Sequence, residues 1–146
     1  MNIKRISSRK AFTLVEVVIA SAIAAICVGT SVYGYVIAMQ RAEWSAYSLA
    51  AQSLAMQRIE QCRACKWDPL AFPAIDELLA VNFPTQISIL DIPVSGTNVV
   101  YATNFTTIQT VSVSPPLKSI RVDCTWGFIN KRTYTNTILT YRSPDQ

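Results

Sequence analysis

The sequence predicts an α+β protein in which one long N-terminal helix, membrane-spanning in its first half, packs through its second half on a C-terminal antiparallel β-sheet. Residues 12–65 form a single helical pattern, apolar all round at first and then apolar along one stripe. Residues 86–141 show short segments rich in Val, Ile, Thr and aromatic residues, separated by Pro, Gly, Asn and Ser. With 146 residues, 51% of them hydrophobic and 15% charged, the chain suits one small domain with a membrane segment attached.

The N-terminal third combines a basic leader with an apolar run of membrane length. Residues 12–38 carry a single charge, Glu16. As a helix at about 1.5 Å per residue this run spans roughly 40 Å, and a bilayer core is about 30 Å thick. The basic residues before it are Lys4, Arg5, Arg9 and Lys10. They predict an N-terminus in the cytoplasm and a body outside the inner membrane. From Ala11 onward nine basic residues balance nine acidic ones, so we expect no nucleic-acid partner.

Three interpretations of this region compete. A cleaved secretory signal would use the small residues at Ala20–Ala22 or Ala22–Ala24, but the hydrophobic run continues well beyond them. An uncleaved signal anchor explains the length and orientation of the run and leaves Glu16 unexplained. A carboxylate in hydrocarbon costs on the order of several kcal/mol unless it is paired or neutralised, so Glu16 indicates a functional residue with a partner.

The third interpretation is a resemblance. A basic leader, a small residue, "FTLVE" and an apolar helix together resemble the N-terminus of type IV pilins and type II secretion pseudopilins. The resemblance implies that a prepilin peptidase cuts between Ala11 and Phe12, and that the new amino group of Phe12 is methylated. It also implies that Glu16 pairs with this amine, in its own or a neighbouring subunit, when the filament assembles. The family usually has Gly before the cut, where this chain has Ala11. The simpler alternative is that Glu16 lies near the headgroups and snorkels.

The function that the resemblance implies is that of a structural subunit, a minor pilin or pseudopilin, of a type IV pilus or type II secretion pseudopilus. Its partners would be prepilin peptidase, other pilin or pseudopilin subunits and the inner membrane. The expected divisions of the chain are a leader at 1–11, a transmembrane and assembly half of the helix at 12–38, an amphipathic half at 39–66, and a β-rich head at 67–146. The alternative from a different class is a single-pass anchored protein whose β-rich body binds a ligand or partner outside the membrane.

The rest of the chain predicts the elements of the head. Along the second half of the helix, apolar residues recur every four positions at Ala42, Ala46, Ala50 and Leu54, and Tyr47, Ala51 and Ile59 lie beside them in the same apolar stripe. Trp67-Asp68-Pro69 ends the helix, and a loop with a short turn of helix at 75–80 follows. Strands are expected at 86–92, 98–102, 106–113, 119–126 and 133–141, the last two joined by a hairpin at Asn130-Lys131. In residues 119–126 the apolar side chains alternate, at Ile120, Val122, Cys124 and Trp126, which predicts one buried face.

Four cysteines need an explanation. Cys27 lies in the membrane run and is expected to be an apolar packing residue. Cys62, Cys65 and Cys124 would face an oxidising compartment, so we expect a disulfide from Cys124 to one of the pair or within the pair. A four-ligand zinc site is not expected, because the chain has no His and only one further extracytoplasmic Cys.

The sequence shows no catalytic constellation. It has no Gly-rich phosphate loop, no Ser with a His base and no carboxylate pair in a recognisable setting. Asp76-Glu77 is expected to be the solvated face of a short helix. We therefore expect no enzyme activity, no catalytic residue, no cofactor and no metal site, calcium included.

Overall fold

The computed structural model describes residues 12–90, 99–128 and 132–145. The chain divides into two compact units, Met1–Ala42 and Glu43–Gln146. Helix α1 (Leu14–Ala64) contributes its first part to one unit and its last part to the other. The predicted helix over residues 12–65 is therefore confirmed, to within two residues at either end.

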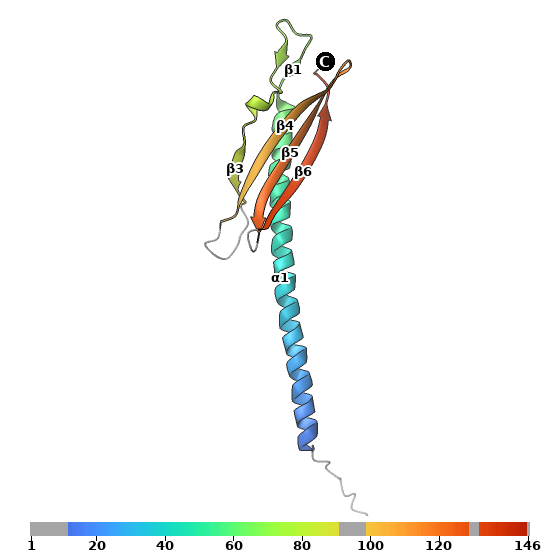
Figure 1. Ribbon diagram of the computed structural model, residues 1–146, viewed down its shortest axis with the longest axis vertical. Helices are drawn as coiled ribbons and strands as arrows, with labels where there is room; N and C mark the ends of the chain where they lie inside the picture. Colours follow the sequence, from blue (N-terminus) through green and yellow to red (C-terminus); the bar gives the residue numbers. More distant parts are fainter. Residues whose placement is uncertain (1–11, 91–98, 129–131, 146) are drawn as a thin grey trace, which may run out of the picture. The chain divides into compact units, whose positions relative to one another are not determined.

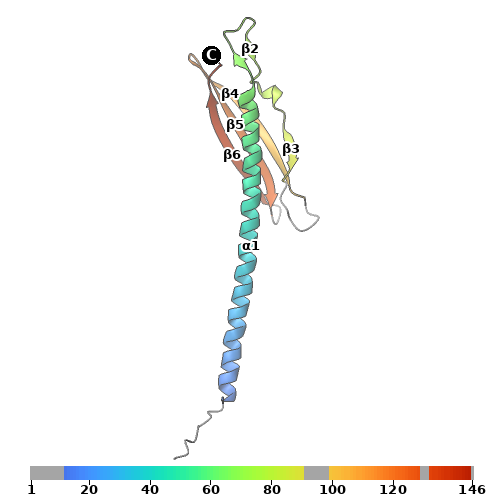
Figure 2. The ribbon, with the colours of Figure 1, turned by 180° about the vertical axis from the view of Figure 1, so that it is seen from behind.

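The unit Glu43–Gln146, called the head below, contains a four-stranded antiparallel sheet. Its strands β3 (Gln86–Ile89), β4 (Tyr101–Val113), β5 (Pro116–Phe128) and β6 (Arg132–Arg142) are neighbours in the order of the sequence. The last part of α1 lies along one face of this sheet, as the front and back views both show (Figure 1, Figure 2). The predicted α+β class, with a helix packed on an antiparallel sheet, is confirmed.

The core of the head lies between α1 and the inner face of the sheet. On β5 the buried apolar residues are the four that alternate in the sequence: Ile120, Val122, Cys124 and Trp126. On α1 the buried residues follow one another at intervals of three or four: Tyr47, Ala51, Ala55, Ile59 and Cys62. Of the predicted stripe, Tyr47, Ala51 and Ile59 are buried in this line, whereas Ala50 and Leu54 are only partly buried. Because Ala51 and Ala55 are completely buried, larger side chains there would separate the helix from the sheet.

One amide side chain joins the helix to the sheet across the core. The Asn136 Oδ1 on β6 accepts a hydrogen bond of 2.9 Å from the indole N–H of Trp126. The Asn136 Nδ2 donates to the carbonyl oxygen and to the hydroxyl oxygen of Ser48 on α1, both at 3.1 Å. A buried indole N–H is costly to leave without an acceptor, so Asn136 both satisfies Trp126 and holds α1 in place.

The end of α1 is held by the last residues of the chain. Arg142 donates to the carbonyl oxygen of Cys62 at 2.9 Å and to Asp145 at 2.7 Å. Asp145 accepts the N–H of Trp67 at 2.9 Å and returns its own N–H to the Trp67 carbonyl at 2.8 Å. These bonds supply a partner for one of the last carbonyls of the helix. The bond from the Trp67 N–H, and then the Arg142 side chain, hold the pKa of Asp145 below its usual value.

Between α1 and β3 the chain forms a short ladder, not a helix. Strands β1 (Trp67–Asp68) and β2 (Ile75–Asp76) pair, and a 3-10 turn η1 (Ala80–Asn82) follows. The predicted turn of helix at 75–80 is wrong. The N–H of Glu77 donates to the carbonyl of Lys66, and the Glu77 carboxylate accepts the N–H of Lys66, both at 2.9 Å. The backbone at Glu77 therefore pairs with Lys66, shortly after the end of α1, and does not form a helical turn.

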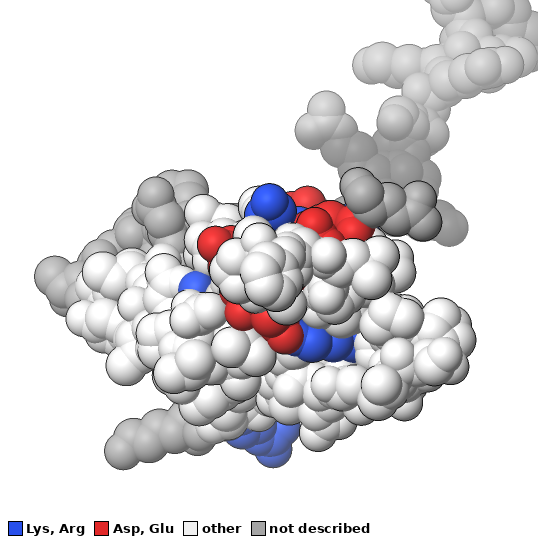
Figure 3. Space-filling view, turned by 90° about the horizontal axis from the view of Figure 1, so that it is seen from above, with Lys and Arg blue, Asp and Glu red and all other residues white. Residues whose placement is uncertain are grey.

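A buried lysine connects this ladder to the sheet. The ammonium of Lys118 on β5 lies 2.6 Å from the Asp76 carboxylate, donates to the carbonyl of Leu78 at 2.9 Å, and sits 4.8 Å from the centre of the Trp67 ring. Asp76 and Glu77 thus make specific contacts, and the expected solvated helix face is not present. Seen from the end of the head at which α1 ends, acidic and basic atoms lie next to one another amid largely uncharged surface (Figure 3).

Two further strand predictions differ from the structure. The strands expected at 98–102 and 106–113 belong to a single strand, β4, because Asn104 continues the ladder opposite Cys124 and is buried. Strand β3 ends at Ile89, before the expected end at Ile92, and residues 91–98 lie outside the described residues. The hairpin turn expected at Asn130-Lys131 also lies outside them, although β5 and β6 pair as far as Phe128 and Arg132.

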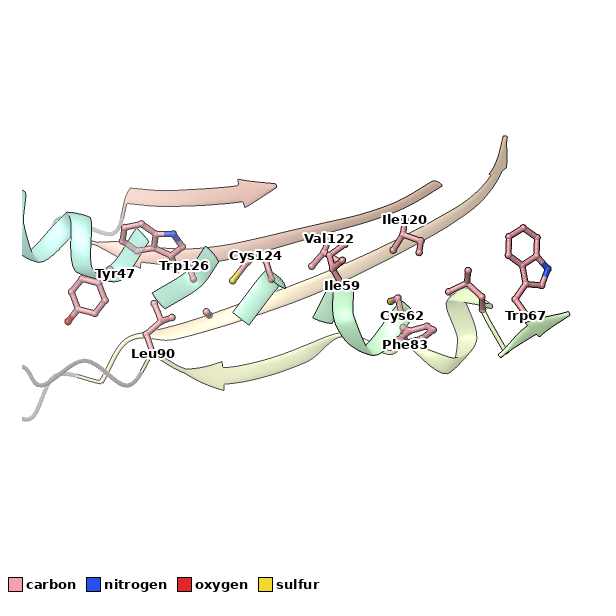
Figure 4. Close-up of a cluster of buried hydrophobic side chains, with 14 residues drawn as sticks. Tyr47, Ile59, Cys62, Trp67, Phe83, Leu90, Ile120, Val122, Cys124 and Trp126 are labelled. Carbon is pink, nitrogen blue, oxygen red and sulfur yellow. The ribbon is translucent and has the colours of Figure 1, made fainter. Parts of the chain in front are cut away.

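All four cysteines lie in the described part of the chain, and all four are free thiols. Cys62 and Cys124 are buried, and burial raises the pKa of each to about 11. Ile59 and Val122 lie between Cys124 and Cys62 in the core, so these two thiols occupy different levels along the helix (Figure 4). A bridge between them would require backbone movement, because a disulfide needs closely spaced Cα atoms. The thiols are free in the structure, and the expected disulfide, from Cys124 to one of the pair or within the pair, stays a prediction.

Replacing Asn136 by Ala should destabilise the head. The change leaves the Trp126 indole N–H without its acceptor and removes the bonds to Ser48, so we expect a loss of about 1–3 kcal/mol in the free energy of unfolding. Urea unfolding of the full chain in detergent, followed by tryptophan emission, measures it. Thr135→Ala, on the exposed face of the same strand, is the matched control and should change stability by less than about 0.5 kcal/mol. Equal effects of the two substitutions would contradict the role given to Asn136.

Alkylation should distinguish the cysteines by their burial. At pH 8 we expect Cys124 to react with iodoacetamide only after unfolding, because its thiol is buried and stays protonated at that pH. Peptide mass spectrometry with and without reductant gives the outcome for each residue. A Cys62–Cys65 bridge would appear as two thiols that react only after unfolding and reduction. A bridge that includes Cys124 would contradict the arrangement of the core.

Candidate assembly site

A reciprocal pair of hydrogen bonds marks the start of α1. The hydroxyl oxygen of Thr13 accepts the N–H of Glu16 at 3.3 Å, and the Glu16 carboxylate accepts the N–H of Thr13 at 3.5 Å. This is a capping box, which satisfies two of the backbone donors that the first turn of a helix leaves without partners. The capping box was not predicted, although its signature, a Thr three positions before a Glu, is present in "FTLVE".

Glu16 is therefore held at the end of the helix that favours negative charge. It lies in the first turn of α1, where the positive end of the helix dipole stabilises a carboxylate. Phe12 precedes the capping box and has 79% of its surface exposed. An ionised carboxylate offers about four acceptor positions, so the contact with Thr13 leaves Glu16 able to accept a further donor.

The surface of α1 around and beyond Glu16 is apolar. Within the described part of the chain one helix, α1, is long and apolar enough to cross a membrane, with a mean hydropathy of 2.1 over its most apolar 18 residues. Large apolar side chains are exposed on every side of it, including Val15, Ile19, Ile26 and Val32. Such a surface is unfavourable in water and suits hydrocarbon.

The hydroxyl groups of Ser21, Thr30 and Ser31 in this stretch bond to the helix itself. The hydroxyl of Ser21 donates to the carbonyl of Val18 at 2.9 Å, and that of Ser31 to the carbonyl of Cys27 at 2.8 Å. Thr30 donates to the carbonyl of Ile26 at 2.9 Å. Because a bilayer core offers no water as a partner, these internal bonds make the segment compatible with hydrocarbon. Glu16 is the one charged residue between Phe12 and Gln40.

The structure thus brings Thr13 and Glu16 together directly after Phe12. Ala11 lies outside the described residues, so cleavage between Ala11 and Phe12 stays a prediction. Pairing of Glu16 with a terminal amine also stays a prediction, now with a local alternative, the cap on Thr13. Cys62, Cys65 and Cys124 lie in the head and take no part in this site.

Comparison with known proteins identifies the N-terminal segment. Residues 6–32 match the family model of the prokaryotic N-terminal methylation motif. The match includes Glu16 and most of the apolar run. No curated protein and no solved structure matches the chain. The motif is the signature of type IV pilins and pseudopilins, and α1, which begins within it, packs through its last part on an antiparallel sheet as the resemblance implied. The chain carries the N-terminal methylation motif of type IV pilins and pseudopilins, on a pilin-like α+β fold.

Proposed function

We propose that the chain is a minor pilin or pseudopilin, a structural subunit of a type IV pilus or a type II secretion pseudopilus that acts by assembly and not by catalysis. The observation that carries the proposal is a single carboxylate, Glu16, within the matched motif and at the start of an exposed apolar helix. The motif indicates a pilin-type subunit, and the Thr-rich strand that follows the strand containing Trp126 resembles the C-terminal end of small pseudopilins and minor pilins.

The first stage of the proposed function takes place in the membrane. Residues 12–38 span the inner membrane, with the basic leader 1–11 in the cytoplasm and the head outside. The length and hydropathy of α1 support this placement. Prepilin peptidase removes the leader and so creates an amino group on Phe12, one helical turn before Glu16. Residues 39–66 form the amphipathic half of the helix, and residues 67–146 form the β-rich globular part.

The second stage is incorporation into a filament through helix packing. Charge on Glu16 is costly in hydrocarbon, and the amine of Phe12 from a neighbouring subunit relieves that cost. A buried ion pair adds little net stability over an apolar contact, but a subunit in the wrong register leaves both charges unpaired. The pair therefore fixes the stagger between subunits. The capping box keeps the carboxylate at the end of the helix, where this amine lies.

The N-terminus of the mature protein tests the processing step. We expect mass spectrometry of protein isolated from cells with a prepilin peptidase to show a chain that begins at Phe12 and carries a methylated amine. Ala11→Gly restores the residue usual in the family and should raise the processed fraction. An intact leader, or a start near Ile23 or Ala25, would contradict the proposal and favour an anchored protein whose head binds a partner outside the membrane.

Two substitutions at Glu16 separate pairing from capping. Glu16→Leu removes the charge and the cap, whereas Glu16→Gln removes the charge and keeps an acceptor for the Thr13 N–H. We expect both to leave membrane insertion intact and to lower incorporation into filaments at least about tenfold, because each leaves the neighbouring amine unpaired. Incorporation is measured in the sheared filament fraction against the membrane pool, with Val17→Leu as control. If Glu16→Gln assembles normally, the cap explains Glu16 and the pairing step is wrong.

A further inference from the structure

Five aromatic side chains gather at one end of the head. They come from three elements and form what we call the aromatic cluster: Trp44 and Tyr47 on α1, Trp126 and Phe128 on β5, and Tyr134 on β6. The ring centroids of Trp126 and Tyr134 are 5.1 Å apart, those of Trp44 and Tyr134 are 5.8 Å apart, and those of Trp44 and Trp126 are 6.2 Å apart. The cluster lies where the head part of α1 begins and where β5 ends.

The cluster has a buried base and an exposed rim. Trp126 and Tyr47 are buried, with 2% and 3% of their surface exposed, whereas 39% of Trp44 is exposed and Tyr134 is half-buried. The Trp126 indole N–H is satisfied by Asn136, but none of the described residues accepts a bond from the indole N–H of Trp44. An aromatic ring packed on one side, with a free polar edge on the other, suits the boundary between hydrocarbon and water.

The position of Trp44 along the helix matches the thickness of a bilayer. From Phe12 to Trp44 the chain advances 32 residues, which is about 48 Å of helix. A bilayer with both headgroup layers is about 40–45 Å thick, and a helix tilted by the usual ~20° crosses it in roughly the same length. If Phe12 lies among the headgroups on one side, Trp44 reaches the headgroups on the other.

Charges of both signs lie near the rim of the cluster, since the acidic Glu43 precedes Trp44 on α1 and a cation lies on β6. Arg132 begins β6, is the ladder partner of Phe128 and is exposed. A cation at the headgroup level attracts lipid phosphates.

We propose that the aromatic cluster docks the head on the headgroup layer of the bilayer, with the Trp44 ring inserted into that layer. This proposal rests on the membrane insertion of α1 proposed above, but not on cleavage at Phe12 or on the filament. The docked head is the state of the subunit in the membrane before assembly. Leaving the membrane for a filament then requires this contact to be released.

Tryptophan quenching by brominated lipids tests the contact. The full chain is reconstituted in phosphatidylcholine and phosphatidylglycerol vesicles, the floating fraction is collected, and its emission is compared in lipids brominated near the headgroup and near the bilayer centre. The chain has three tryptophans, Trp44, Trp67 and Trp126. We expect headgroup-proximal bromine to quench the wild type more strongly than deep bromine. Trp44→Phe, which keeps an aromatic ring, should remove at least about half of the quenching.

Trp67→Phe is the matched control, because Trp67 is buried beneath Lys118 at the other end of the core (Figure 4). It should leave the quenched component unchanged. Equal quenching of wild type and Trp44→Phe, or no quenching in a chain that floats with the vesicles, would overturn the docking proposal alone. Emission that depends on protein concentration and not on bromine would show that a second copy covers the cluster, and would also overturn it. A chain that does not float would contradict the membrane insertion on which both proposals rest, while the mass of the N-terminus reports on processing independently.

Discussion

The close contact between α1 and the inner face of the sheet is the constraint on which the head depends. Two fully buried alanines, Ala51 and Ala55, allow the sheet to approach the helix backbone, and Ile59 fills the space beside Val122. Apolar packing of this kind does not by itself fix the position of a helix along a sheet. Asn136 does so by bonding to Ser48, and Arg142 does so by bonding to the carbonyl of Cys62, about one turn beyond Ile59. A slide by one turn would break both sets of bonds.

The first part of the same helix meets the opposite requirement. It has no single apolar stripe, because every side of it must be compatible with hydrocarbon. The hydroxyl groups of Ser21 and Ser31 bond back to the helix. Polarity is thereby concentrated in one side chain, Glu16, whose carboxylate is held at the first turn by Thr13. An otherwise uniform apolar surface gives helices little to distinguish one alignment from another. A single charge at a fixed height along the helix can supply that distinction.

The sequence predicted the features that arise from local periodicity and missed those that depend on distant residues. The helix and the buried face of β5 were predicted because Ile120, Val122 and Cys124 alternate without interruption. The β1–β2 ladder could not be predicted, because it depends on Lys118, which comes from a strand 40 residues later and is buried against Leu78. The spacing of the cysteines in the sequence likewise does not tell how far apart their thiols lie along the core. The capping box could have been predicted, since Thr13 and Glu16 are three positions apart. The same residues also belong to the family motif, which was used to interpret them instead.

The reciprocal bonds between Asp145 and Trp67 have a consequence for handling the protein. Asp145, which follows β6, bonds back to Trp67 shortly after α1, and these bonds close the head. An affinity tag fused after Gln146 begins one residue from this closure, and a deletion that removes Asp145 opens it. A tag on the leader would be lost with the leader if the peptidase cuts as proposed. Purification of the intact subunit is therefore best served by a tag separated from Gln146 by a long Gly/Ser spacer, whose flexibility keeps strain away from the closure.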